Sequence, residues 1–506
     1  MMTIIKQDDL INSIADALQF ISYYHPKDYI QALAKAYEQE QSAPAKDAIA
    51  QILYNSRLCA QGHRPICQDT GIAVIFIEVG MAVQWDCTMS LEEMINEGVR
   101  QAYNHPDNIL RASVLADPAG ARINTKDNTP AIIHTKLVSG NSVKVKLAAK
   151  GGGSENKAKF AALNPSSDLV AWVLKSVADM GAGWCPPGIL GVGIGGTPEK
   201  AMLLAKESLL APVTIQDLIR EAEQGKRLTR PEELRLELYE KINALGIGAQ
   251  GLGGLTTVVD VKVLDYPTHA ASLPVAIIPN CAATRHTHFT LDGSGPAVLT
   301  PPALTDWPDI TWQPSAQARH VNLDNLSKED IQYWQPGEQL LLSGKLLTGR
   351  DAAHKRIIDT LARGEALPDG VDFTNRFIYY VGPVDAVRDE PVGPAGPTTA
   401  TRMDKYTETM LAQTGLIGMV GKAERGAIAI DAIKKHKAVY LTAVGGAAYL
   451  ISKAIEKATI IAYAELGMEA IYEFEIKDMP VTVGVDVHGE SVHQSGPKKW
   501  AKIIPQ

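Results

Sequence analysis

Residues 63–80 read H-R-P-I-C-Q-D-T-G-I-A-V-I-F-I-E-V-G, and this stretch decides the fold that we expect. Pro and Gly punctuate its first half, which indicates a loop. Its second half is a short, nearly continuous β-rich run, which is typical of a strand buried on both faces. A thiol and several polar groups therefore lie on a loop directly before a buried strand, a place where binding and catalytic residues are often found.

Similar transitions recur on both sides of this stretch. Helical spacing of apolar residues predicts helices over residues 8–18, 47–59 and 168–180. Residues 143–157 alternate apolar residues with lysine and then reach three glycines, which predicts a strand followed by a flexible polar loop. Residues 184–210 predict a loop, a strand, a glycine turn and a helix. The pattern is that of an α/β protein.

A change in composition divides the chain. Residues 293–327 are rich in Pro and Trp and have no sustained periodicity. We therefore expect three parts, with residues 1–300 as an N-terminal α/β region, residues 301–330 as a linker and residues 331–506 as a smaller C-terminal α/β domain.

The C-terminal part also alternates strands and helices. Strands are expected over residues 337–349, 376–383 and 437–446. A helix is expected over residues 402–420, and an amphipathic or buried helix over residues 447–466, where lysine and glutamate interrupt the apolar residues. Residues 471–487 predict a pair of strands broken at Met479 and Pro480.

A mildly acidic charge balance limits the partners of the protein. The chain has 49 Lys and Arg against 57 Asp and Glu, a formal net charge of -8 at pH 7. Such a protein has no overall attraction for nucleic acid or anionic lipid, so we expect neither as a partner. Residues 1–20 carry acids where a signal peptide carries basic residues, and charges interrupt the most apolar late stretch. We expect a cytoplasmic protein without a membrane span.

Five cysteines in a chain of 506 residues do not form a disulfide framework. Cys67, Cys185 and Cys281 lie in loops rich in Pro, Gly or small polar residues, whereas Cys59 and Cys87 lack such surroundings. Their spacing matches no zinc or ferredoxin pattern. The residue pattern therefore leaves four alternatives open.

The four alternatives differ in their chemistry. In the first, all five cysteines are buried small hydrophobic residues. In the second, three loop thiolates bind three irons of a [4Fe-4S] cluster, and the fourth iron stays open to a substrate oxygen as a Lewis acid. In the third, Cys281 binds zinc together with His286 and His288. In the fourth, one cysteine is a catalytic nucleophile.

Cationic side chains in loops of small residues suggest an anionic substrate. These side chains are Arg111, Arg350, Arg402 and Lys422. Each taken alone is more typical of a solvated surface charge, but together they suggest clamps for a substrate with two carboxylates. Asp69 and Thr398 lie close in sequence to Cys67 and Arg402, which makes them candidates for proton transfer. An Asx turn at Asp69 and a helix cap at Thr398 are the structural alternatives.

Two glycine-rich segments resemble nucleotide-binding loops only in composition. Residues 191–200 follow an apolar run and precede a helix, but their glycines lack the G-x-G-x-x-G spacing of a dinucleotide site. Residues 246–254 lack the Lys-Ser/Thr ending of a P-loop. Tight backbone packing is the favoured interpretation of residues 191–200, and an NAD-dependent dehydrogenase is the weaker alternative. Residues 246–254 are interpreted as tight backbone packing or a loop near a ligand.

Six blocks of sequence, in order along the chain, together resemble the signature blocks of class I fumarate hydratases, the oxygen-sensitive iron-sulfur type. They read R-P-I-C-Q-D-T-G, N-T-K-D-N-T-P-A-I-I-H, K-G-G-G-S-E-N-K, W-C-P-P-G-I-L-G-V-G-I-G-G, P-N-C-A-A-T-R-H and G-P-T-T-A-T-R-M-D. The blocks extend over almost the whole chain, and their joint occurrence is highly specific. The resemblance therefore favours a [4Fe-4S] cluster.

The resemblance implies an N-terminal mixed α/β region that binds the cluster, a C-terminal swivelling β/β/α domain that closes over it, and a homodimer. The positions that match cluster ligands are Cys67, Cys185 and Cys281. The positions that match the substrate site are Gln68, Asp69, Arg111, Gly152, Arg350, Thr398, Arg402 and Lys422. Thr401 stands where the family has Gly, and the turn after Lys422 is less rich in glycine than expected.

The activity that the resemblance implies is the reversible, stereospecific hydration of fumarate to L-malate. Thr398 and Asp69 are then the proton-transfer pair, and the four cations share the two carboxylates of the substrate. Mesaconate or L-tartrate is the alternative substrate within the same family. An iron-responsive protein that uses cluster loss as a switch belongs to a different class, and the absence of a basic stripe argues against it.

Overall fold

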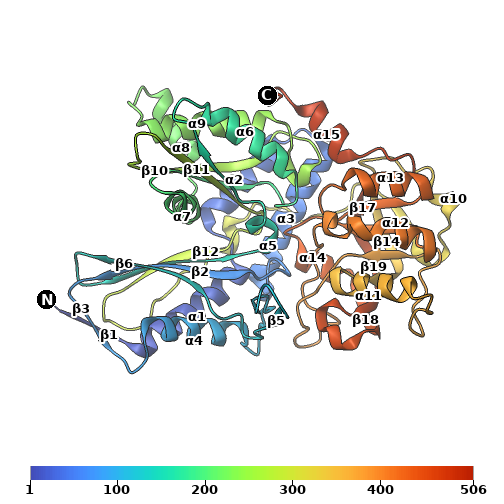
Figure 1. The fold of residues 1–506 in the computed structure, drawn as a ribbon, viewed down its shortest axis with the longest axis horizontal. Helices are drawn as coiled ribbons and strands as arrows, with labels where there is room; N and C mark the ends of the chain where they lie inside the picture. Colours follow the sequence, from blue (N-terminus) through green and yellow to red (C-terminus); the bar gives the residue numbers. More distant parts are fainter. Residues whose placement is uncertain (1, 505–506) are drawn as a thin grey trace.

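The computed structural model describes residues 2–504 and has the mixed α/β character that the sequence predicts. Two four-stranded sheets lie in the N-terminal part, and a seven-stranded sheet lies in the C-terminal part. The three sheets surround a shared middle (Figure 1), which contains α3 (Ala43–Gly62), α5 (Gly152–Glu155) and α14 (Ala448–Ser452). Within the described residues, none of the helices has the length and apolar character that a membrane span requires.

The first sheet is built around the strand that residues 72–80 predict. Its strands, in order, are β12 (His286–Leu291), β7 (Val143–Lys150), β2 (Ile72–Gly80) and β6 (Ile132–Val138). Ile75 and Ile77 of β2 point into a core with helices α1 (Gln7–Tyr23) and α4 (Leu91–Tyr103). Val74 and Phe76 belong to a second core that the other N-terminal sheet shares. Both faces of β2 are therefore buried, as its continuous apolar run indicates.

The second sheet has helices on both faces. Its strands, in order, are β10 (Val258–Tyr266), β9 (Gly188–Gly195), β11 (Leu273–Asn280) and β8 (Lys159–Leu163). Helices α6 (Leu169–Met180) and α9 (Arg230–Ala244) pack on one face, where they bury Leu190, Val192 and Val261. Helices α7 (Pro198–Ser208), α2 (Lys27–Gln39) and α3 form the core on the other face. This sheet is the scaffold for the loops at residues 184 and 281.

The glycines of β9 are explained by close packing of a helix. A Cβ atom on Gly191 would lie 2.2 Å from the carbonyl oxygen of Ala205, and one on Gly193 would lie 2.0 Å from that of Ala201. Both carbonyls belong to α7, so only glycine lets this helix lie against the strand. The close packing predicted for residues 191–200 is confirmed, but Gly191 and Gly193 lie within strand β9 and not in a turn.

The C-terminal part contains one mixed sheet between two groups of helices. Its strands, in order, are β13 (Arg319–Asn322), β14 (Gln339–Thr348), β15 (Phe377–Tyr379), β16 (Gly418–Gly421), β17 (Val439–Thr442), β19 (Ile471–Val485) and β18 (Ile455–Ala462). Helices α11 (Asp351–Ala362), α12 (Asp404–Gln413) and α13 (Ala427–His436) cover one face. Strand β13 pairs with β14, so this sheet begins inside the segment predicted as a linker. The domain boundaries themselves stay a prediction.

Smaller elements complete the described chain. They are β1 (Thr3–Lys6), β3 (Val83–Asp86), β4 (Leu115–Ala116), β5 (Ile123–Asn124), α8 (Ile215–Glu223), α10 (Lys328–Ile331), α15 (Val492–Trp500), and 3-10 turns at Ala249–Gly251, Leu304–Asp306, Leu323–Asn325, Ala400–Met403 and Ala464–Glu469. Helix α15 returns to the N-terminal part, where the backbone of Gly496 packs against Leu252 and Gly253. Tight backbone packing against Gly496 therefore explains why part of the segment 246–254 is rich in glycine.

The helix predicted over residues 447–466 is wrong in its second half. The helix α14 ends at Ser452, and residues 455–462 form the edge strand β18. β-Branched Ile and Thr favour a strand here, and the exposed charges of Glu456 and Lys457 suit a sheet edge. The charge pattern of these residues also suits an amphipathic helix. The strand forms because β19 offers it a pairing partner.

The helix predicted over residues 402–420 is too long. A 3-10 turn leads into α12, which ends at Gln413. Gly415 then has a φ of 74°, a left-handed conformation that commonly ends helices. Strand β16 follows, so the last residues of the predicted helix belong to the sheet.

The strand pair predicted over residues 471–487 is instead one strand, β19. One side of β19 pairs with β14 along most of its length, whereas the partner on the other side changes from β18 to β17 between Ile476 and Thr482. Pro480 stands at this change of partner, where one side of the strand lacks a continuous ladder. Proline is tolerated there and does not break the strand.

Two buried side-chain amides join the N-terminal and C-terminal parts. Asn55, on α3, donates to the carbonyl oxygens of Ile66 at 3.2 Å and Gly446 at 3.0 Å. Its Oδ1 accepts from the backbone N–H groups of Tyr449 and Leu450, both at 2.9 Å. Asn55 is 0% exposed, so all of its hydrogen-bonding capacity is used inside the protein.

Gln250 forms the second connection. Its Nε2 donates to the carbonyl oxygens of Pro186 at 2.8 Å and Gly445 at 3.2 Å, and its Oε1 accepts from the N–H of Gly445 at 2.8 Å. Ile66 and Pro186 are the neighbours of Cys67 and Cys185 in sequence. The two amides therefore hold the turn at residues 444–450 against both cysteine loops.

We predict that Asn55→Leu lowers the free energy of unfolding by about 2–4 kcal/mol, because four buried backbone groups lose their partner. Urea unfolding followed by circular dichroism measures this change. Asn164→Ala is the control, since Asn164 is exposed and caps only its own turn, and we expect a change within about 0.5 kcal/mol. Equal effects of the two substitutions would contradict the structural role of Asn55.

Candidate active site

The ends of the N-terminal strands bring three loops together. The start of β2 lies beside the end of β7, because Ile72 pairs with Lys150. The end of β11 lies beside the start of β9, because Asn280 pairs with Ile189. The loop after β11 then leads into β12, which is the other neighbour of β7. These loops carry Cys67, Cys185 and Cys281.

The three cysteines predicted as ligands lie close together and are mostly covered. Cys67 is 8% exposed, Cys185 is 4% exposed and Cys281 is partly exposed. Cys67 and Cys281 border one small apolar cluster, and the N–H of Ala282 donates to the carbonyl oxygen of Cys185 at 2.9 Å. Burial is the largest cause of the raised pKa of the Cys185 thiol, and the charges of Cys281 and Cys67 raise it further. The three thiols therefore lie within electrostatic range of one another.

The other two cysteines have different surroundings. Cys59 is fully buried on α3, beneath Cys67, where burial raises the pKa of its thiol well above the usual value. Cys87 is exposed, far in the sequence from any of the three loops. The sequence distinguished these two from the loop cysteines, and the structure separates them in the same way.

Lys422 extends from the end of β16 in the C-terminal sheet towards the three cysteine thiols. Its Nζ donates to Sγ of Cys185 at 2.9 Å, although the residue is only 9% exposed. Burial raises the pKa of the Cys185 thiol to about 11, and the Lys422 ammonium acts in the opposite direction. A Cβ atom on Gly445 would lie 2.5 Å from Sγ of Cys185, so glycine is required to leave room for this sulfur.

The side chains of this site match one of the two metal centres that the sequence suggests. Among residues 2–504, no three His, Cys, Asp or Glu side chains are arranged to hold a single metal ion. The zinc site with Cys281, His286 and His288 is therefore not formed, and His288 is exposed. A [4Fe-4S] cluster whose three thiolates each hold a different iron does not require the thiols to converge on one ion. The three separate loops and the neighbouring cations would fit such a cluster.

Asp69 lies beside the thiols and is held in its charged form. Its Oδ2 accepts from the N–H of Gly152 at 2.8 Å, and Nη2 of Arg111 lies 3.7 Å from its Oδ1. Burial alone would raise the pKa of Asp69, but Arg111, Arg285 and Lys422 together with the Gly152 N–H lower it. The contact with Gly152 orders the predicted flexible loop, whose residues 152–155 form α5.

Arg111 of the N-terminal part and Arg350 of the C-terminal part both contact Gly382. We call the region where the two parts meet at Gly382, Pro397 and Lys422 the joint. Arg111 donates to the carbonyl oxygen of Gly382, and a Cβ atom on Gly382 would lie 2.7 Å from Nη1 of Arg350. Burial and the charge of Arg350 lower the pKa of Arg111 to about 10. Arg350 is held by Glu469, whose Oε1 lies 2.6 Å from Nη2. Two predicted clamps therefore face one another at a single glycine.

Gln68 and Thr398 lie at the same joint. Nε2 of Gln68 donates to the carbonyl oxygen of Pro397 at 3.2 Å, which places Thr398 next to the Cys67 loop. The N–H of Thr398 donates to Tyr380, and its carbonyl oxygen accepts from the N–H of Lys422 at 3.1 Å. Thr398 is 6% exposed, and no hydrogen bond joins it to Asp69 among the described residues.

Arg402 is the most exposed of the four predicted clamps. Its side chain is 46% exposed, and its guanidinium is paired with Asp351. The hydrogen bonds of its side chain in residues 2–504 go to that carboxylate. The structure therefore groups Arg111, Arg350 and Lys422 around the joint and places Arg402 towards solvent.

Arg285 is a residue of this site that sequence reasoning missed. It lies four residues after Cys281 and is 2% exposed. It acts more strongly than Lys422 in lowering the pKa of the Cys67 thiol, which burial raises. The quoted block P-N-C-A-A-T-R-H contains it, so the signal was present in the sequence. A single arginine in a loop gives no indication of burial.

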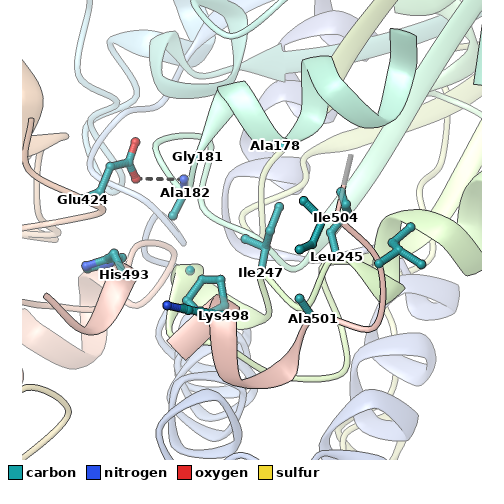
Figure 2. A pocket seen from close by; sticks show the side chains of 13 residues that line it. Ala178, Gly181, Ala182, Leu245, Ile247, Glu424, His493, Lys498, Ala501 and Ile504 are labelled. Carbon is teal, nitrogen blue, oxygen red and sulfur yellow. Dashed lines mark hydrogen bonds between the residues drawn. The ribbon is translucent and has the colours of Figure 1, made fainter. Parts of the chain in front are cut away.

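An apolar cavity of about 280 Å³ is lined by Ala182 and Glu424, which are close in sequence to Cys185 and Lys422. Figure 2 shows Glu424 at its rim, where the carboxylate accepts from the N–H of Ala182 at 2.9 Å. His493 and Lys498 line the cavity from α15. None of the predicted site residues lines this cavity, so it is distinct from the thiol and cation group.

Fold and site together define a two-part α/β enzyme that combines cysteine thiols with buried cations. Comparison with known families agrees with this class. A model described as fumarate hydratase matches residues 11–290, and one described as the fumarase C-terminus matches residues 293–496. The chain therefore belongs to the class I fumarate hydratase family.

Individual relatives support the same family. The anaerobic class I fumarate hydratase of Escherichia coli K12 is 32% identical over 487 residues, which cover 93% of this chain and 86% of the relative. Fumarate hydratase 2 of Leishmania major is 30% identical, over 94% of this chain and 85% of its own length. A candidate L(+)-tartrate dehydratase subunit alpha of Methanocaldococcus jannaschii is 34% identical over 54% of this chain and 94% of its own.

We predict that Lys422→Met raises the pKa of the Cys185 thiol above about 11, because burial then acts without an opposing ammonium group. The expected result is slower alkylation of Cys185 in the cofactor-free protein near about pH 9, measured by mass spectrometry of the labelled peptide. Lys453→Met is the control, since Lys453 lies over the ring of Tyr449 and forms no contact with Cys185. Unchanged alkylation in Lys422→Met would show that the ammonium does not act on this thiol.

Proposed function

We propose that this enzyme catalyses the reversible hydration of fumarate to L-malate with a [4Fe-4S] cluster bound by Cys67, Cys185 and Cys281. The observation that carries the proposal is the meeting of three thiols from three loops, two of them buried and one partly exposed, beside a buried ammonium group. Membership of the family supports the reaction, and the neighbouring positive charge of Lys422 supports thiolates at these positions.

The cluster, when bound, supplies a Lewis-acidic iron that draws electron density from the substrate hydroxyl. The chain itself supplies the binding of the two carboxylates. Arg111, Arg350 and Lys422 reach the joint from different loops, and Arg402 lies nearer to solvent. Gln68 and Gly152 border the same space. Gln68 orients the substrate through its amide group, and the N–H of Gly152 holds the Asp69 carboxylate in place.

Internal carboxylates hold two of the clamps in place. Glu469 is paired with Arg350, and Asp351 is paired with Arg402. Charge-assisted pairs of this kind fix the guanidinium groups near the geometry that a substrate carboxylate requires. We propose that the substrate binds to donors of these arginines that the internal pairs leave free.

Thr398 and Asp69 are proposed as the pair that exchanges the C3 proton. Asp69 stays ionised because the neighbouring cations lower its pKa, so it can accept a proton. A Thr hydroxyl without assistance is a weak base near neutral pH. The Asp69 carboxylate therefore has to act on Oγ1 of Thr398 through the bound substrate or a movement of the joint, since the two are not hydrogen bonded in the structure.

We further propose that the enzyme is a cytoplasmic homodimer that binds a small dicarboxylate substrate. The net charge of -8 supports the expectation of no nucleic acid partner and no membrane partner. The homodimer rests on the resemblance to the family. Equilibrium sedimentation measures it directly.

L-Tartrate or mesaconate is the second candidate substrate. The relative from Methanocaldococcus jannaschii favours tartrate, because its name assigns it to a tartrate dehydratase. One methyl or hydroxyl group changes transition-state binding by only about 1–3 kcal/mol, which a few pocket contacts supply. The coverage favours fumarate, since the fumarate hydratases match both parts of the chain.

We predict that Cys185→Ser lowers the iron and sulfide content of anaerobically purified protein and reduces fumarate hydration by at least about 100-fold, because a cluster ligand is lost. Iron and sulfide analysis with an anaerobic hydration assay measures both effects. Cys87→Ser is the matched control, because Cys87 is an exposed cysteine outside the thiol group. Four irons retained in Cys185→Ser would remove this residue from the ligand set.

We predict that the anaerobic enzyme has a value of kcat/KM for fumarate at least about tenfold above the values for mesaconate and L-tartrate, which corresponds to about 1.4 kcal/mol of transition-state binding. Initial rates with each substrate under the same conditions measure this ratio. A larger value for tartrate or mesaconate would replace fumarate by that substrate and leave the reaction class unchanged.

A further inference from the structure

Arg285 is a buried cation without a partner of its own. It follows the Cys281 loop and directly precedes β12, and it is 2% exposed. Its Nε has no hydrogen-bond partner in the described protein. Residues 2–504 also provide no carboxylate within salt-bridge distance of it, and the ion pair of the nearby Asp69 is with Arg111. A buried guanidinium in this state is costly, because it has lost water and gained no acceptor.

The other cations of the site all have acceptors within the chain. They are Arg111 with Gly382 and Asp69, Arg350 with Glu469, Arg402 with Asp351, and Lys422 with Cys185. Arg285 differs from these four cations in having no such acceptor among the described residues. Arg285 therefore keeps more unused hydrogen-bond donors than any of these four cations. An anion from outside the chain can bind to those donors.

Arg285 faces the reactive part of the site. A Cβ atom on Gly151 would lie 3.5 Å from Nη2 of Arg285 and 3.1 Å from Oδ2 of Asp69, so both groups border the same backbone. The positive charge of Arg285 also acts on Cys67 and Asp69. The guanidinium thus lies near Asp69, the proposed proton-transfer residue, and within electrostatic range of the Cys67 thiol.

We propose that Arg285 is a substrate-binding residue whose guanidinium binds one carboxylate of the dicarboxylate. This inference rests on the proposed function for the choice of substrate. A planar guanidinium with free donors matches a carboxylate through two parallel hydrogen bonds, and burial strengthens that interaction. Asp69, which borders the same Gly151, is then close to the bound substrate.

The test uses the anaerobically purified full-length holoenzyme and two variants, Arg285→Gln and Arg285→Lys. Iron and sulfide content, KM and kcat for L-malate and fumarate, and the rise in melting temperature caused by L-malate are measured for each. The rise in melting temperature reports substrate binding without catalysis. Arg235→Gln is the matched control, since Arg235 is a largely buried arginine that is already paired with Asp260 at 2.8 Å.

We expect Arg285→Gln to keep the wild-type iron content, to raise KM by about tenfold or more and to lose most of the malate-induced rise in melting temperature. Arg285→Lys keeps the charge but not the two parallel donors, so an intermediate KM is expected. Arg235→Gln is expected to lower the melting temperature without changing the rise caused by malate.

A wild-type KM and a wild-type malate response in Arg285→Gln would overturn the proposal. Loss of iron in Arg285→Gln would overturn it as well, because the anion at Arg285 would then be a sulfide of the cluster. A wild-type enzyme that binds malate but neither hydrates fumarate nor contains iron would refute the proposed function. The malate response of the variants would still decide the role of Arg285 in that case.

Discussion

The site depends on one constraint, the attachment of the turn at residues 444–450 to two cysteine loops. Asn55 and Gln250 provide it through buried amides whose partners are backbone groups in both parts of the chain. Backbone groups in such a position must be paired, because unpaired polar groups inside a protein are costly. The same turn supplies Gly445, which leaves room for Sγ of Cys185, and the neighbouring strand β16 ends beside Lys422. Without this attachment the thiols and the cations of the C-terminal part, among them Arg350 and Lys422, would belong to separate surfaces.

The electrostatic design follows from that enclosure. Burial raises the pKa values of the thiols of Cys67 and Cys185, while the ammonium of Lys422 and the guanidinium of Arg285 act in the opposite direction. Asp69 stays charged by the same cations. A low-dielectric site makes each of these interactions stronger than in water, and it makes an unpaired charge more costly. The internal pairs of Arg350 and Arg402 reduce that cost for two of the cations, which leaves Arg285 as the cation that lacks an internal acceptor among the described residues.

Local pattern was reliable where the tertiary surroundings agreed with it. The run at residues 72–80 is buried on both faces and forms β2, and glycines 191 and 193 serve the close approach of α7. Pattern failed where a neighbouring strand decided the outcome. Residues 455–462 have the composition of an amphipathic helix but pair with β19, and Pro480 lies inside a continuous strand because its partner changes there. The burial of Arg285 could not be predicted either, since no local sequence signal distinguishes a buried arginine in a loop from an exposed one.

The sequence by itself determined the α/β class, the family and the three loop cysteines, because these follow from periodicity and from motifs that are local in the chain. It also separated Cys59 and Cys87 from the other thiols by their surroundings. Only the tertiary structure decided which cations face those thiols. It placed Arg402 towards solvent with Asp351, brought both Arg111 and Arg350 to Gly382, and revealed a buried Arg285 near Asp69. The physical reason is that contacts between residues hundreds of positions apart depend on strand pairing and on the buried joint, which no short stretch of sequence encodes.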